Sequence, residues 1–210
     1  MTSNSESPPA WTSREWDLIN VTEVFKHKPG LMKKAEGYLE ALRTSLREEW
    51  ASQANLFPDG TDLVKGQIAR GENHNGFPFI SLDLPQKFSK TEYFTGRTLF
   101  WWGHYLGFSL IAKKPDMDTY LRRLVDKRHE ERYAEIYLSR NPTPWEWERN
   151  ESNFVPVSEP KNDGLRDLVH GLQYLKLIRF FPLSDPSFPH LDWVRTGTTV
   201  YRDLIELVLD

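Results

Sequence analysis

The side chains with the clearest chemical potential lie in two neighbouring stretches, residues 77–84 and 97–107. His104 interrupts an otherwise apolar alternation, and burial can move the pKa of an imidazole across neutral pH, so it is a candidate proton carrier or ligand contact. Asp83 lies on a strand face and needs a partner if that face is buried. Arg97 is the expected partner across a hairpin. The alternative for His104 is structural, as a buried neutral ring that hydrogen-bonds to its neighbours.

A face of alternating aromatic and glycine residues follows Arg97. Trp101 and Tyr105 alternate there with Gly103 and Gly107. A strand glycine favours close approach of another group. That group is either one of the protein's own helices or a ligand. A concave, mostly apolar surface with few polar groups is the usual form of a small-molecule site. The predicted ligand-binding residues are Asp83, Arg97, Trp101, Gly103, His104, Tyr105 and Gly107.

A second pair of candidate groups is Glu146 and Glu148, which alternate with Trp145 and Trp147 on a predicted strand. Two carboxylates on one face could act as an acid–base pair or bind a metal. The alternative is that the tryptophans are core and the glutamates solvated. The sequence lacks the phosphate loop, the dinucleotide fingerprint, the His-Glu-x-x-His helix and the Gly-x-Ser-x-Gly elbow. We therefore assign no metal site, and the cofactor is unknown.

The strands that must position these residues are predicted from side-chain alternation. Residues 77–84 alternate and end at Pro85, which lacks a ladder donor. Residues 98–112 are predicted to form one central strand, because both of its faces are largely apolar. Between them, Ser89 and Glu92 form a capping-box pattern and Gly96 a stop signal, which together predict a short helix over residues 90–95. Further strands are predicted over 63–69, 132–138, 145–148, 153–157 and 177–181.

The helices are predicted from capping signals and apolar stripes. Thr12 and Glu15 form a capping box before a short helix over residues 13–19, and Trp11 and Trp16 are expected to be packed. A long helix is predicted after Pro29-Gly30, because leucines recur at steps of three and four. Three more helices are predicted after Pro115, after Asp163 and from Trp193 to the end of the chain.

Length and composition indicate the fold class. With 210 residues, the chain is expected to form one domain with a substantial core. Residues 1–10 are polar and contain two prolines, so we predict a disordered tail there and a single globular domain over residues 11–210. Hairpin-like turns between strands, with helices near the ends of the chain, predict an α+β fold with a mainly antiparallel sheet and helices packed chiefly on one face.

Charge and cysteine content narrow the functional classes. The net charge of −3 gives no electrostatic footprint for nucleic acid, and the chain has no cysteine, which fits the cytoplasm. The apolar run of 15 residues over 98–112 is shorter than the roughly 20 of a membrane-spanning helix, so no membrane partner is expected. The leading hypothesis is a small-molecule-binding module with an aromatic-lined pocket. The alternatives are an enzyme that uses a strand His or carboxylate, and a protein-interaction domain. The oligomeric state is unassigned.

Overall fold

A computed structural model describes residues 9–209, and the chain divides into two compact units, the first ending at Lys34 and the second beginning at Ala35. The predicted tail over residues 1–10 lies mostly outside the described residues. In the first unit, α1 spans Ser13–Ile19, and the predicted capping box is present: Glu15 N donates to Thr12 Oγ1 at 3.2 Å and Thr12 N donates to Glu15 Oε2 at 2.7 Å. Trp11 and Trp16, expected to be packed, are exposed.

The long helix α2 spans Glu23–Trp50 and therefore begins earlier than predicted. Pro29 lies inside it. A proline inside a helix removes one backbone donor, and its ring crowds the carbonyl four residues earlier, so it normally kinks or ends a helix. Here the helical residues continue through Pro29 and Gly30, so this pair is not the boundary that it resembles. From Ala35 onward the predicted stripe is buried, with Leu39, Leu42 and Leu46 fully inside.

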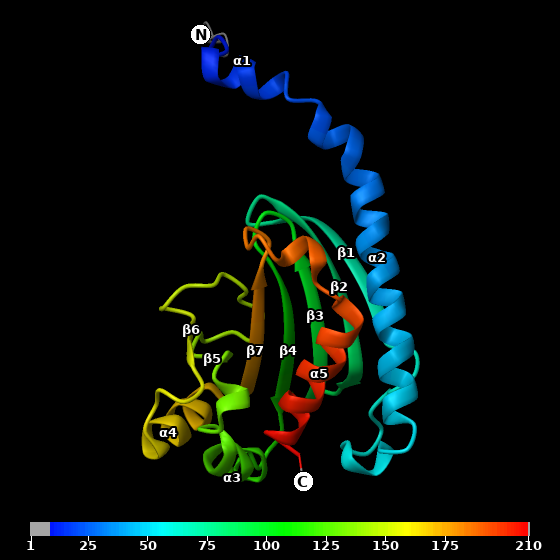
Figure 1. The fold of residues 1–210 in the computed structure, drawn as a ribbon. Helices are drawn as coiled ribbons and strands as arrows, with labels where there is room; N and C mark the ends of the chain where they lie inside the picture. The colour runs from blue at the N-terminus through cyan, green and yellow to red at the C-terminus, as the bar shows by residue number, and fades with distance from the viewer. Residues whose placement is uncertain (1–8, 210) are drawn as a thin grey trace, which may run out of the picture. The chain divides into compact units, whose positions relative to one another are not determined.

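The second unit is built on one antiparallel sheet of seven strands in the order β1-β2-β3-β4-β7-β5-β6 (Figure 1). Each neighbouring pair in this sheet is antiparallel. The strands are β1 Gln67–His74, β2 Phe77–Phe88, β3 Tyr93–Trp101, β4 Tyr105–Lys113, β5 Ile136–Ser139, β6 Phe154–Pro156 and β7 Leu175–Pro182.

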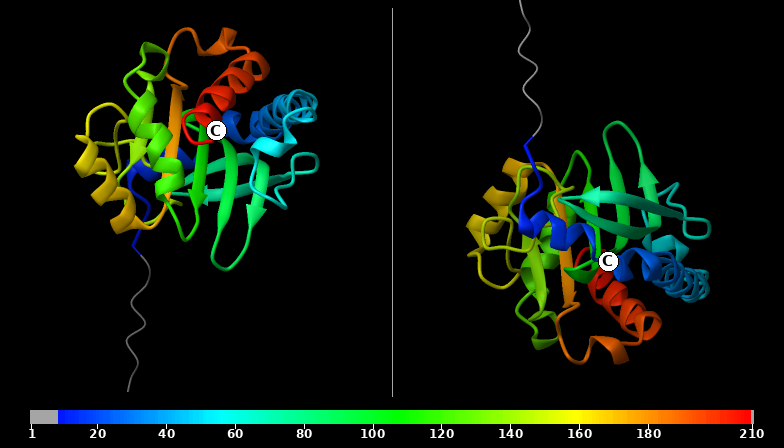
Figure 2. Two further views of the ribbon diagram at one scale, coloured as in Figure 1. Left: turned by 90° about the horizontal axis from the view of Figure 1, so that it is seen from below. Right: turned by 90° about the horizontal axis from the view of Figure 1, so that it is seen from above.

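One face of the sheet is covered by helices, as predicted. Helix α5, Trp193–Glu206, packs on β4 and β7, and the second-unit part of α2 lies beside it (Figure 2). At the helix crossing, a Cβ on Gly197 would lie 2.7 Å from Phe108 and 2.8 Å from Leu42. Tyr201 of α5 shares a buried 2.9 Å hydrogen bond with Thr98. The other helices of this unit are α3 Asp118–Lys127 and α4 Asn162–Leu172, with short 3-10 turns at Ala54–Leu56, Glu131–Tyr133 and Phe188–His190.

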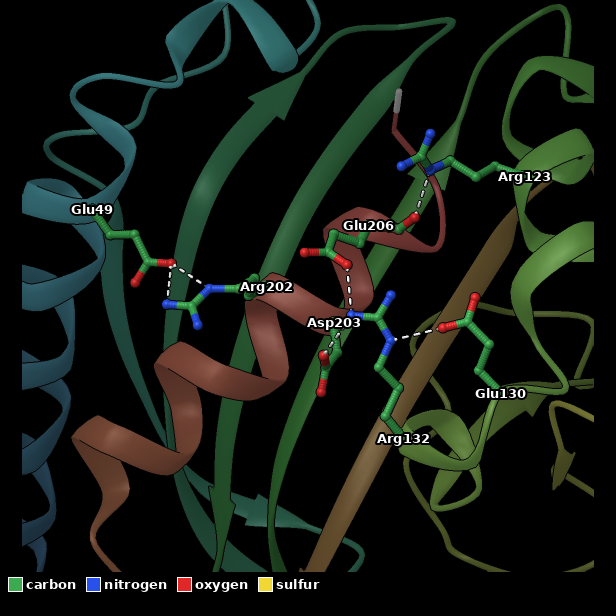
Figure 3. A network of polar contacts seen from close by, with 7 residues as sticks. All are labelled: Glu49, Arg123, Glu130, Arg132, Arg202, Asp203 and Glu206. Carbon is green, nitrogen blue, oxygen red and sulfur yellow. Dashed lines mark hydrogen bonds and ion pairs between the residues drawn. The ribbon is translucent and has the colours of Figure 1, made fainter.

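Polar contacts hold α5 on both of its flanks (Figure 3). Arg202 forms an ion pair with Glu49 of α2 at 2.9 Å. On the other flank, Arg132 lies 2.7 Å from Glu206 and 3.8 Å from Asp203. Individual ion pairs of this exposed kind contribute little, about 0–1 kcal/mol each. Their role here is to fix the helix's position over a core that burial already stabilises.

Two predictions in the centre of the chain are wrong, because a hairpin turn falls at the start of one segment and in the middle of the other. No helix forms over residues 90–95: Ser89 Oγ accepts the Glu92 N–H at 2.9 Å, but Ser89 N also donates to Glu92 O at 2.8 Å, which closes the β2–β3 turn. Residues 98–112 are not one strand. Trp101 pairs with Tyr105, and the chain reverses through Gly103, whose φ of 78° favours glycine.

The remaining strand predictions differ in their bounds. Strand β2 continues past Pro85 through a register shift, and β1 lies further along the chain than residues 63–69. Residues 145–148 form no strand and belong to a long connection between β5 and β6. The expected edge strand over 153–157 is confirmed, because β6 pairs only with β5. The strand expected over 177–181 is confirmed as β7.

Candidate functional site

The face of the sheet opposite α5 carries an aromatic cluster. Because neighbouring strand residues point to opposite faces, Arg97 and Leu99 point away from the α5 side that Thr98 faces. Around them packs a buried group covered by the connection 141–153. This aromatic cluster consists of Leu99, Trp101, Tyr105, Ile111, Trp147, Phe154, Ile178 and Phe180, with Phe79, Tyr93 and Tyr137 partly buried at its margin.

Asp83 and Arg97 pair with each other on this face. They are register partners on β2 and β3, and both contacts, Arg97 Nε to Asp83 Oδ1 and Nη2 to Oδ2, measure 2.6 Å. The expected partnership is therefore present as a bidentate ion pair. The Arg97 guanidinium also lies 5.0 Å from the Trp145 ring and 5.6 Å from the Trp147 ring. Arg97 therefore has a carboxylate beside it and indole rings over it.

Trp101, His104 and Tyr105 form a stacked group at the β3–β4 turn. The His104 and Trp101 rings are stacked at 3.7 Å, and Tyr105 meets Trp101 edge-on at 5.8 Å. His104 Nε2 is buried and has no hydrogen-bond partner among the residues that the structure describes. Gly103 lies in the turn, and the space beside Gly107 is occupied by the side chains of Tyr105 and Ile178. The predicted residues thus form two groups, an ion pair and an aromatic stack.

The connection 141–153 is attached to the sheet by a buried lysine. Lys176 of β7 is fully buried, and its ammonium group donates to Pro144 O at 2.9 Å and to Glu146 O at 2.5 Å. Burial lowers the pKa of Lys176 well below its ordinary value, and nearby Arg97 lowers that pKa further. Tyr105 adds a second attachment, since its hydroxyl donates to Trp147 O at 2.5 Å, and burial raises the pKa of Tyr105.

The Glu146 and Glu148 pair is not arranged as an acid–base pair on one strand. Glu146 Oε1 accepts the backbone N–H groups of Trp147 and Glu148, both at 2.7 Å, so this carboxylate shapes the turn of the connection. Glu148 is exposed. Within residues 9–209, no group of three or more His, Asp or Glu side chains is placed to hold a metal ion.

A cavity of about 590 Å³ opens at the β6 edge of the aromatic cluster. We name it the Arg149 cleft. Tyr137 and Phe154 of the cluster form its apolar wall, and four charged side chains surround it. Its lining includes Tyr137, Arg140, Arg149, Glu151, Phe154 and Glu159.

Arg149 also lines a neighbouring cavity of about 400 Å³, together with Phe180. Its guanidinium lies 5.4 Å from the Tyr137 ring and 5.1 Å from the Phe180 ring. Across the described residues, neither Arg149 nor Arg140 has an ion pair or a side-chain hydrogen bond. The cleft thus presents two cationic groups that lack a carboxylate partner, beside flat apolar surfaces.

A further cavity of about 430 Å³, lined by residues of β2, β3, β4 and α3, differs in this respect. Two of its three lysines already have partners: Lys87 pairs with Glu92 at 2.8 Å, and Lys114 lies 4.5 Å from the Tyr120 ring. The Arg149 cleft is therefore the stronger candidate for an anionic ligand.

The cleft residues were not among those predicted from the sequence. Arg140 and Arg149 stand on either side of Trp145 and Trp147, which were predicted to lie on a strand. Pro142 and Pro144 are turn signals, and irregular loops often carry binding residues, so this part of the sequence does hold a signal for a binding loop. That both arginines line one cavity with Phe154 could not be read from their spacing.

No protein-family model matches the sequence, and no curated protein and no solved structure matches the chain. None of the helices described over residues 9–209 has the length and apolar character needed to cross a membrane.

Proposed function

We propose that this protein is a binding module for a small molecule that carries a carboxylate or phosphate group and a flat apolar part, held in the Arg149 cleft. One observation carries the proposal. Arg140 and Arg149, which have no ion-pair partner among the described residues, line one cavity together with the Tyr137 and Phe154 rings. A volume of about 590 Å³ falls within the roughly 300–1,000 Å³ of small-molecule sites.

Each part of the cleft has a defined role in this proposal. A guanidinium presents a planar fork of donors that matches carboxylate and phosphate oxygens. The Tyr137 and Phe154 faces receive the apolar part of the ligand. Glu151 and Glu159, which also line the cleft, would take an amino or hydroxyl group and disfavour a highly charged polyanion. Amino acids and other small zwitterions are therefore included in the expected class.

The ligand contacts predicted from the sequence, at Asp83, Arg97 and residues 101–107, stay a prediction. In this proposal they support the cleft from behind, because the Tyr105 ring packs on Phe180 at 4.8 Å and Phe180 packs on Phe154 at 5.1 Å. We further propose a cytoplasmic location from the absence of cysteine, and no nucleic-acid partner from the net charge of −3. No observation favours the enzyme hypothesis over binding.

The proposal is tested by thermal shift with a panel of aromatic and aliphatic carboxylates, phosphate monoesters and amino acids. A ligand at about 100 times its dissociation constant stabilises the folded state by roughly 2.7 kcal/mol. We expect at least one anionic member with an apolar part to raise the melting temperature of the protein. The same ligand should shift Arg149→Gln much less, because its carboxylate or phosphate loses its main donor.

The matched control is Arg195→Gln, which removes an exposed arginine on α5 far along the chain from the cleft residues. It should retain the full shift. An equal loss of the ligand-induced melting-temperature shift in Arg149→Gln and Arg195→Gln would mean that binding depends on the overall charge of the protein. A panel in which every hit is retained by Arg149→Gln and by Arg140→Gln would place binding elsewhere and reject this proposal.

A further inference from the structure

The first unit exposes an unusual amount of apolar surface. Of the thirteen large hydrophobic side chains that are exposed among residues 9–209, eight lie within residues 11–34, and the exposed fractions of Trp11, Trp16 and Phe25 are 72%, 61% and 70%. The others in this N-terminal segment, as we call residues 11–34, are Leu18, Ile19, Val21, Val24 and Leu31. Single exposed hydrophobic residues are ordinary, but a continuous series of this kind marks an interaction surface.

The secondary structure of the segment gives a second reason to expect a covering partner. Helix α1 has seven residues, none of them buried. Isolated helices shorter than about 12–15 residues are only marginally stable in water, and packing of an apolar face normally supplies the missing stability. In α2, Val24 and Leu31 are separated by seven residues, two helical turns, and so lie on one side of the helix.

The charges of the segment suggest what that partner is. Its first half carries Glu15, Asp17 and Glu23 against the single cation Arg14. The second half, residues 24–34, contains no acidic residue and has four lysines, Lys26, Lys28, Lys33 and Lys34. Two copies placed side by side in opposite directions would bring the acidic half of each against the basic half of the other. The segment is therefore complementary to itself.

We propose that the N-terminal segment pairs antiparallel with the same segment of a second copy and forms a two-fold symmetric dimer. The available area fits. Aromatic side chains bury about 150–250 Å² each, so Trp11, Trp16 and Phe25 would supply roughly 300–500 Å² at their present exposure. A standard interface buries about 800 Å² on each partner, and the five exposed aliphatic side chains contribute the remainder. This inference is independent of the Arg149 cleft.

The first test is the mass of the full chain in solution, by light scattering after gel filtration at about 100 µM. We expect twice 24.7 kDa. The double variant Trp16→Glu/Phe25→Glu should have the monomer mass, with the circular dichroism and melting temperature of the second unit retained. Phe88→Glu is the control, because it places the same charge on an exposed aromatic of β2 and should stay dimeric. A monomeric unaltered chain, or a double variant that is still dimeric, overturns the proposal.

The second test fixes the direction of pairing and does not depend on the behaviour of the double variant. The chain has no cysteine, so single introduced cysteines report without background. Thr22→Cys lies at the middle of the segment and should form a disulfide-linked dimer with itself under mild oxidation. Ser13→Cys and Lys33→Cys lie near opposite ends, so each should cross-link only when the two are mixed. Efficient cross-linking of Ser13→Cys to itself, or no cross-link at Thr22→Cys, overturns antiparallel pairing.

Discussion

The ammonium group of Lys176 lies 3.4 Å from the centroid of the Trp147 ring, fully enclosed between the sheet and the connection 141–153. Its two hydrogen bonds run to the carbonyls of Pro144 and Glu146. Lys176, on the central strand β7, therefore determines the path of the irregular connection 141–153. Because Arg149 belongs to that segment, the shape of the cleft depends on this buried contact.

Lys176→Met should loosen the connection while leaving the sheet folded. The variant keeps a long apolar side chain but removes the donor of two partly buried carbonyls, and an unsatisfied group costs up to about 1–3 kcal/mol when it is fully buried. Hydrogen exchange should become faster in residues 141–153 and stay slow in β3 and β4. Equal acceleration in both regions would show that the lysine supports the whole core and not this connection alone.

The stability contribution of Lys176 should depend on pH. Burial lowers the pKa of Lys176 in the folded protein, so between the folded pKa and the ordinary value of 10.5 the unfolded chain binds a proton that the folded chain lacks. The contribution is therefore complete above pH 10.5 and is lost as the pH falls towards the folded pKa. Urea denaturation at about pH 7, 8.5 and 10 should show the unaltered protein gaining stability relative to Lys176→Met. A difference in unfolding free energy between the two proteins that stays constant over these pH values would contradict this pH dependence.

Breaking the Asp83–Arg97 pair from one side should be costly. The side chains are 7% and 21% exposed, and removing one partner of a buried pair leaves an uncompensated charge, at a cost of about 3–5 kcal/mol. Since Arg97 is partly exposed, we expect about 2–4 kcal/mol for Arg97→Met alone. The double variant Asp83→Leu/Arg97→Met should recover much of that loss in chemical denaturation. Additive losses would mean that the two charges do not depend on each other.

Gly197→Ala should destabilise the protein although alanine favours helices. Its Cβ would lie 2.7 Å from Phe108 Cε1 and 2.8 Å from Leu42 Cδ1, and overpacking of this kind costs about 1–3 kcal/mol. The matched control is Gly164→Ala in α4, where nothing lies within 4 Å of the new atom. That variant should gain up to about 1 kcal/mol from helix propensity. Melting temperatures that move in the same direction would refute the crowding at the α2–α5 crossing.

Asp203→Asn should stabilise the protein at neutral pH. Burial raises the pKa of Asp203, while Arg132, at 3.8 Å, partly opposes the increase. A carboxyl with a raised folded pKa contributes stability below its unfolded pKa, and that contribution is lost as the pH rises through the folded pKa. We expect a gain of about 0.5 kcal/mol for the variant at about pH 7 that disappears near pH 3. A loss at neutral pH would mean that the Arg132 contact outweighs burial.

Much of the fold could be predicted because its signals are periodic. The leucine stripe of α2, the capping box at Thr12 and the edge position of β6 all depend on local patterns. The hairpin turn at Ser89 shows the limit. The hydrogen bond from Glu92 N to Ser89 Oγ is common to helix caps and to turns, so the residue types alone do not distinguish them. Gly103 likewise marks a turn only once its positive φ is known.

The candidate site was predictable only in part. Asp83 and Arg97 were expected to pair, and their register on β2 and β3 makes that contact. The Arg149 cleft was not anticipated, because it depends on the path of an irregular segment that a lysine on β7 holds in place. Local sequence predicts that residues 141–144 form a turn, but it carries no information on which distant donors will bond to the carbonyls of that turn.

The strand order has a consequence for how the chain assembles. Strands β1 to β4 are consecutive neighbours and can pair in turn as a meander. Strand β7, in contrast, lies between β4 and β5 in the sheet. Strand β5 touches no earlier strand, so the β5–β6 pair has no sheet to join until Leu175–Pro182 has arrived. Contacts this distant along the chain form slowly, since loop closure precedes any gain from pairing. During synthesis the β4 edge that pairs with β7 therefore stays open until Leu175–Pro182 has been made, and the β5–β6 pair that borders the cleft joins the sheet only after that.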